Sequence, residues 1–181
     1  MDELSPSVWF PVVTLVVGVM LKAGFDVLIE GRKAAVEKAV RFEKRKEAIL
    51  MQRIESQRKA LGDLQVAISI LVRCSSLGHI SDADVFHKTG IWGKAMLPED
   101  LNEQTRAAFR EVSLIKVRIH DSRLRTAVDE LSELCSQLPF ASSFKESENT
   151  VFAAGNRFAI VNEMIGETLR ALEGDEQALL V

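Results

Sequence analysis

The residue types that most readily bind a metal ion gather in one short stretch, where His79, Asp82, Asp84 and His87 follow Cys74. Imidazole, thiolate and carboxylate groups are the usual ligands of zinc and related ions. Their spacing here is irregular and matches neither an HExxH pair on a helix nor an EF-hand loop. We interpret them as polar residues of a solvated loop, and we expect no metal site and no cofactor.

Catalytic motifs are missing from the rest of the sequence. It contains no GxxxxGK[ST], GxGxxG or GxSxG motif, which would hold a phosphate or present a nucleophile. No glutamate stands three residues before His120, so the paired ExxH motif of a di-iron bundle is also missing. The sequence therefore predicts a protein that is not an enzyme.

The string KVRIHDSRLR places four basic side chains on one predicted helix. They are Lys116, Arg118, Arg123 and Arg125. Asp121 and Asp129 lie three or four residues away from several of them, which favours ion pairs on the helix surface. Because the net charge of the chain is −3, we expect no nucleic-acid partner.

The two cysteines, Cys74 and Cys135, lie far apart in amphipathic segments and form no CxxC pair. A small buried thiol is the usual occupant of such positions. We expect both to be inert core thiols, in keeping with a reducing, cytoplasmic environment.

The elements that position these residues begin with an apolar stretch. Val8 to Leu21 is fourteen residues without a charge, whereas a membrane span needs about twenty. Lys22 and Asp26 follow it at a spacing of four, where opposite charges on a helix can neutralise each other. With Trp9 and Phe10 as interfacial aromatics, residues 1–30 are predicted to form a membrane anchor.

The sequence also bears on two alternatives to an anchor. No basic residue precedes the apolar run and no small-x-small site follows it, which argues against a secretion signal. A buried first helix of a soluble bundle stays open, since fourteen apolar residues also suit a core helix. That helix would need burial on every side, because no polar residue recurs along it at helical spacing.

The charge distribution sets the expected orientation of the anchor. Glu30 to Lys59 carries ten basic and five acidic residues, so the remainder of the chain holds a net charge of −8. The positive-inside rule then predicts a single-pass inner-membrane protein with its N-terminus outside and its bundle in the cytoplasm. Residues 31–49 are predicted to be a charged juxtamembrane helix, in modest contact with the lipid bilayer. Its basic residues are Arg32, Lys33, Lys38, Arg41, Lys44, Arg45 and Lys46.

Residues 50–174 are predicted to form an antiparallel helical bundle, which makes the chain all-α. From Leu50 to Leu71 apolar residues recur at alternating intervals of four and three, the heptad seam of packed helices, with Gln57 in one slot. Further helices are expected over residues 99–138 and about 148–172, with Asn162 in the seam of the latter and a frayed tail over 175–181. Gln57 and Asn162 either fix the register of the seam or lie at its edge in water.

Residues 75–98 lose this periodicity and contain three glycines and a proline, so we expect a long loop there. The loop is apolar for its kind, with Phe86, Ile91 and Trp92 among its members. It is expected to cap the bundle or, alternatively, to contact a partner.

The order WFPVVTLVVGVMLKAGFD, then a charged helix, then a closing NEMIGETLRAL resembles the layout of many small uncharacterised bacterial proteins. In these, one N-terminal span precedes a cytoplasmic helical bundle. The resemblance implies this layout and carries no activity or site residues.

Three functions follow as hypotheses. The first is a membrane-anchored interaction, scaffold or sensing module, which pairs with itself or with a protein partner through its seam. The second is a membrane-acting effector of the defence or toxin type whose spans assemble, motivated by Lys22 and Asp26. The third is a soluble ligand-binding bundle with a buried first helix and a pocket at His79 or His87.

Overall fold

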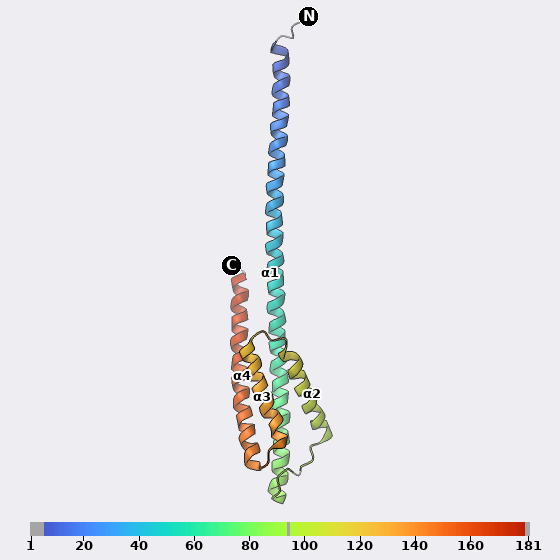
Figure 1. Ribbon diagram of the computed structural model, residues 1–181, viewed down its shortest axis with the longest axis vertical. Helices are drawn as coiled ribbons and strands as arrows, with labels where there is room; N and C mark the ends of the chain where they lie inside the picture. Colours follow the sequence, from blue (N-terminus) through green and yellow to red (C-terminus); the bar gives the residue numbers. More distant parts are fainter. Residues whose placement is uncertain (1–5, 94, 180–181) are drawn as a thin grey trace. The chain divides into compact units, whose positions relative to one another are not determined.

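The chain is all-α, as the sequence predicts. The computed structural model describes the backbone of residues 6–93 and 95–179, and the side chains of this range except those of residues 6–12 and 27. The elements are α1 (Pro6–Thr89), α2 (Glu99–Lys116), α3 (Ser122–Gln137), a 3-10 helix (Leu138–Phe140) and α4 (Phe144–Leu179) (Figure 1). No strand occurs among these described residues.

The chain divides into two compact units, Met1–Leu50 and Met51–Val181. Unit 1 contains α1 as far as Leu50, and unit 2 contains the remainder of α1 with α2, α3 and α4. Within unit 2 successive helices run in opposite directions, and α3 lies beside α4 (Figure 1). Unit 2 is therefore an antiparallel helical bundle.

The core of unit 2 is built on the heptad seam of α1. Leu61, Leu64, Ile68 and Leu71 of this seam are completely buried. The core residues that they join come from the other three helices: Val112 and Ile115 of α2, Leu124, Val128 and Leu131 of α3, and Val161 and Ile165 of α4. Removal of these side chains from water is the main force that closes the bundle. The seam is thus occupied by helices of the same chain.

The prediction of a long loop over residues 75–98 is wrong for residues 75–89, because α1 continues to Thr89. No proline stands between Pro11 and Pro98, and a helix tolerates the single Gly78 at a cost of about 1 kcal/mol. The helix ends at Gly90, whose φ of +70° suits the left-handed cap that glycine adopts without strain. Its amide donates to Phe86 O at 2.7 Å, closing the last turn. The true connection is residues 90–98.

The prediction of a single helix over residues 99–138 is also wrong, because α2 ends at Lys116 and a separate helix, α3, begins at Ser122. Asp121 caps α3, its carboxylate accepting from the amides of Arg123 at 2.8 Å and Leu124 at 3.3 Å. Such a cap favours a new helix start. The break coincides with the change of phase between Ile119 and Leu124, both of which are buried in the core.

The last helix is longer at both ends than the sequence indicates. Ser143 caps α4, because its hydroxyl accepts from the Glu146 amide at 3.2 Å. The Glu146 carboxylate in turn accepts from the Ser142 amide at 2.8 Å, which resembles a capping box. At the other end the tail is helical to Leu179 rather than frayed from residue 175. An ion pair between Glu176 and Arg58 of α1, at 2.5 Å, holds this last turn to the bundle.

Candidate membrane and interaction surfaces

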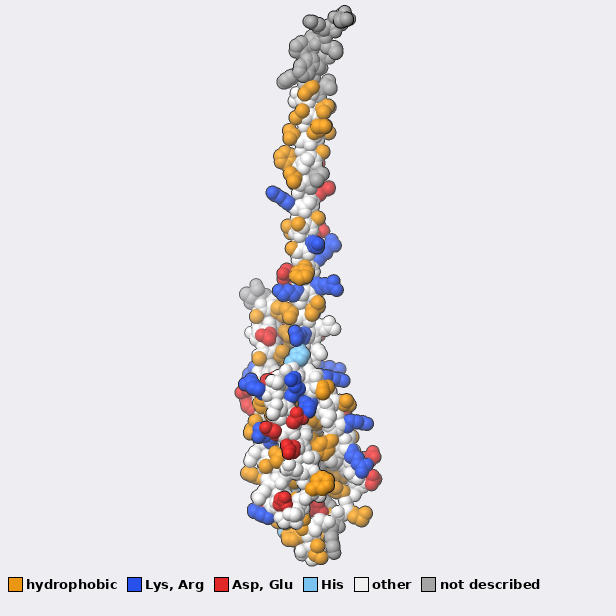
Figure 2. All heavy atoms as spheres, in the orientation of Figure 1, with side chains coloured by type: hydrophobic (Ala, Val, Ile, Leu, Met, Phe, Trp, Pro, Cys, Tyr) orange, Lys and Arg blue, Asp and Glu red, His pale blue; other side chains and the backbone are white. Residues whose placement is uncertain are grey.

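The described part of unit 1 exposes large apolar side chains on every side of the helix. Leu15, Val16 and Val17 are consecutive, so they point about 100° apart around α1, yet they are 68, 47 and 49% exposed. Farther along, Phe25 and Leu28 are still more than 60% exposed. Figure 2 shows orange side chains gathered along the described start of unit 1, with blue side chains beginning among them and becoming more numerous farther along the chain. A helix that is apolar all round belongs in an apolar environment.

The expected span begins before the first described side chain. Trp9 and Phe10, the predicted interfacial aromatics, lie outside the residues whose side chains the structure describes. Over the part of the chain that it does describe, none of the helices is both long and apolar enough to traverse a bilayer.

The charged residues of unit 1 whose side chains the structure describes are all exposed. Lys22 and Asp26 lie one turn apart on α1, and no ion pair joins them within the described residues. The seven predicted juxtamembrane basic residues are likewise exposed along the helix. Arg41 pairs with Glu37 at 3.1 Å, an exposed contact that contributes little to stability.

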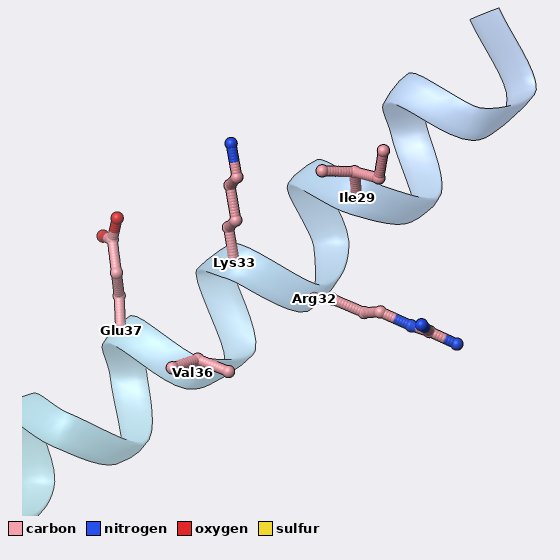
Figure 3. A pocket seen from close by; sticks show the side chains of 5 residues that line it. All are labelled: Ile29, Arg32, Lys33, Val36 and Glu37. Carbon is pink, nitrogen blue, oxygen red and sulfur yellow. The ribbon is translucent and has the colours of Figure 1, made fainter. Parts of the chain in front are cut away.

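A shallow hollow of about 340 Å³ lies on α1 within this basic segment. Ile29, Arg32, Lys33, Val36 and Glu37 line it, all from one helix. Arg32 leaves the helix on one side, and Lys33 and Glu37 leave it on the other (Figure 3). Because no second element closes it, the hollow is a helix face rather than a ligand cavity.

The predicted partner loop is largely packed within unit 2. Phe86 belongs to α1 and stacks on Phe144 of α4, with ring centroids 5.4 Å apart and planes 9° apart. Trp92 meets Phe144 edge-on at 5.8 Å, and its indole N–H donates to Ala141 O at 2.9 Å. Ile91 is 47% exposed. The residues 90–98 therefore cap one end of the bundle, and Ile91 is the member of the predicted set that faces solvent.

Two histidines join this packing, to form an aromatic cluster of His79, Phe86, His87, Trp92 and Phe144. His79 Nδ1 hydrogen-bonds to the buried Ser147 Oγ at 2.8 Å. The sequence does not predict that Phe144 and Ser147 join this cluster, because only tertiary packing brings α4 beside residues 79–92. In the sequence, the feature that could have indicated the cluster is the set of aromatic and imidazole side chains within residues 79–92.

Both polar residues of the heptad seams make specific bonds. Gln57 is buried, donating to Arg118 O at 2.7 Å and accepting from the His120 amide at 3.0 Å. It thereby ties α1 to the connection between α2 and α3. Asn162 accepts from Gln65 of α1 at 3.1 Å on the surface of the bundle. Gln57 is therefore buried within the seam rather than in water at its edge, and Asn162 lies nearer the edge.

The basic string around His120 is engaged within the bundle. Lys116 pairs with Asp129, and Arg123 lies 3.9 Å from Asp121. The Arg125 guanidinium donates to the carbonyl of Ile119 at 2.5 Å and to that of His120 at 3.0 Å. These bonds brace the turn before α3.

Cys74 and Cys135 are free thiols buried in the core, as expected. Burial raises the pKa of the Cys135 thiol, and the hydroxyl of Ser75 offsets that rise only in part. A raised pKa keeps the thiol protonated and unreactive. Among the described residues no three His, Cys, Asp or Glu side chains are grouped to hold a metal ion.

Comparison with known proteins gives no further indication of function, since no family model, no curated protein and no solved structure matches this chain.

Proposed function

We propose that the chain is a membrane-anchored helical-bundle protein. Residues 8–29 insert in a bilayer, and the bundle of unit 2 serves on the cytoplasmic side as an interaction or sensing module rather than as an enzyme. The observation that carries this proposal is the exposure of apolar side chains around the whole circumference of α1 between Val13 and Ile29.

A bilayer accounts for this exposure better than one docking partner does. A partner helix would cover one face and leave the remainder in water, whereas lipid surrounds a helix completely. The apolar run also starts at Val8, which adds five residues ahead of the first described side chain. The stretch from Val8 to Ile29 is 22 residues long, which reaches the length of about twenty residues that a span needs.

The flanking charges support one orientation. Acidic Asp2 and Glu3 precede the apolar stretch, and the predicted juxtamembrane basic residues follow it. Basic residues are retained on the cytoplasmic side of inner membranes. The proposed arrangement therefore leaves a short N-terminus outside and unit 2 inside the cell.

Carbonate extraction of membranes from cells that express the full chain tests the anchor. The wild-type protein should stay in the membrane pellet and float with lipid on a density gradient, which separates insertion from aggregation. Val16→Lys combined with Val19→Lys should release most of the protein, because each lysine costs about 3 kcal/mol at mid-membrane. Val36→Lys combined with Val40→Lys is the matched control and should leave the protein in the pellet. Release of the wild-type chain would overturn the proposal.

A further inference from the structure

The basic segment of α1 carries a second pattern besides charge. Lys22, Asp26, Ile29, Lys33, Val36 and Val40 follow one another at alternating intervals of four and three. This is the heptad spacing that the seam of unit 2 uses, and it places these residues along one stripe of the helix. Ile29, Val36 and Val40 of this stripe are 49, 63 and 47% exposed. In unit 2 the same spacing is buried, whereas here it is open.

The hollow of Figure 3 lies on this stripe. Ile29, Arg32, Lys33 and Val36 are four residues at the relative positions that form the hole of a coiled coil, into which one side chain of a facing helix inserts. In a parallel, in-register pair the inserting side chain is Lys33 of the other helix. A lysine at such a position favours one register at some cost in stability.

The charged residues that flank the stripe would be complementary between two copies of the helix. Arg32 and Glu37 leave the helix on opposite sides of the stripe and lie five residues apart (Figure 3). In a parallel pair of heptad helices, flanking residues at this spacing meet across the interface. Arg32 of each copy would thus reach Glu37 of the other. Among the described residues Glu37 pairs only with the exposed Arg41, and such an exposed pair is easily exchanged.

We propose that this stripe is the surface on which a second copy of the chain docks, in parallel and in register, with Arg32 of one copy paired to Glu37 of the other. The parallel direction rests on the proposed function, because copies inserted in one membrane share one orientation. At the N-terminal end of the stripe, Lys22 and Asp26 carry opposite charges within the apolar stretch. Lys22 of one copy pairs there with Asp26 of the other, which removes two lone charges from lipid.

Disulfide cross-linking in membranes from cells that express the full chain tests the docking. Val36→Cys places a thiol on the stripe, and Ala34→Cys, about 200° around the helix, is the matched control. Oxidation should give a dimer with Val36→Cys and little with Ala34→Cys. The native Cys74 and Cys135, 3 and 1% exposed, should give none alone. Equal dimer from both positions, or adducts with other proteins only, would overturn the proposal.

Charge reversal in the Val36→Cys background tests the pairing itself. Arg32→Glu and Glu37→Arg should each lower the dimer about tenfold, because each variant brings like charges together across the interface. Co-expression of the two variants under different tags should restore a dimer that contains both tags. Since neither variant alone can form it, this rescue excludes misfolding and pairing within one helix. Undiminished dimer in the single variants, or no rescue, contradicts the proposal.

The same membranes, extracted with carbonate, separate this inference from the proposed function. Protein that stays in the pellet but does not cross-link at Val36→Cys overturns the docking and leaves the anchor. Protein that is released but still cross-links overturns the anchor and leaves the docking.

Discussion

Gln57 shows how one buried amide joins distant parts of the bundle. Its side chain bonds both a carbonyl and an amide of the connection between α2 and α3, at Arg118 and His120. The neighbouring seam positions Ile54 and Leu61 are apolar and buried, so their side chains offer this connection no such hydrogen bond. The sequence marked Gln57 as an interruption of the seam but left its partners open. Those partners are more than sixty residues away, where spacing arguments do not reach.

Gln57→Leu should lower the free energy of unfolding of the bundle by about 1–3 kcal/mol, since it leaves two backbone groups unsatisfied. Urea unfolding of the detergent-solubilised protein measures this, followed by Trp92 fluorescence in a Trp9→Phe background. Gln52→Leu, at an exposed position of α1, is the control and should change the free energy by less than about 0.5 kcal/mol. Equal effects of the two substitutions would show that the amide bonds contribute nothing.

At the scale of elements, the type of structure was predictable and the ends of the helices were not. Heptad spacing identifies the Leu50–Leu71 part of α1 and most of α4, because burial requires an apolar stripe at that period, but it did not separate α2 from α3. The end of α1 depends on Gly90 rather than on the equally visible Gly78, and only the positive φ of Gly90 distinguishes them. The end of α4 depends on the Arg58–Glu176 ion pair, which joins residues far apart in the sequence.

The start of α4 should be sensitive to acid. Hydrogen bonds from the Ser142 hydroxyl and amide hold the pKa of Glu146 below its ordinary value. A lowered pKa in the folded state means that the contribution to stability is present above the unfolded value of about 4.3 and is lost as the pH falls through the folded value. Acidification should therefore weaken this cap.

Glu146→Gln should destabilise the protein at neutral pH and make little difference in acid, because protonated glutamate resembles glutamine. Urea unfolding of both proteins across the range from about pH 7 to pH 3 measures the difference. Glu167→Gln, at an exposed position of the same helix, is the control and should show no such pH dependence. A difference between wild type and Glu146→Gln that persists unchanged in acid would contradict this account of the cap.

At the scale of the whole molecule, the sequence identified the contrast between an apolar first segment and a helical bundle. It did not identify the aromatic cluster, because His79, Phe86 and Trp92 meet Phe144 only after α4 packs back on α1. Phe86 and Trp92, the aromatic side chains that had suggested a partner site, are packed within this cluster. The extended exposed surfaces that remain in unit 1 are the apolar segment and the stripe beside Arg32, on which the proposed functions rest.

The central claim is that the apolar segment lies in a bilayer with unit 2 on the inner side. Cysteine accessibility in spheroplasts tests it most directly, with Val19→Cys inside the segment and Gln52→Cys at an exposed position of unit 2. A membrane-impermeant maleimide should label Gln52→Cys only after the membrane is permeabilised, and Val19→Cys only after detergent dissolves it. Labelling of Val19→Cys in permeabilised spheroplasts before detergent is added, or labelling of Gln52→Cys in intact spheroplasts, would contradict the account.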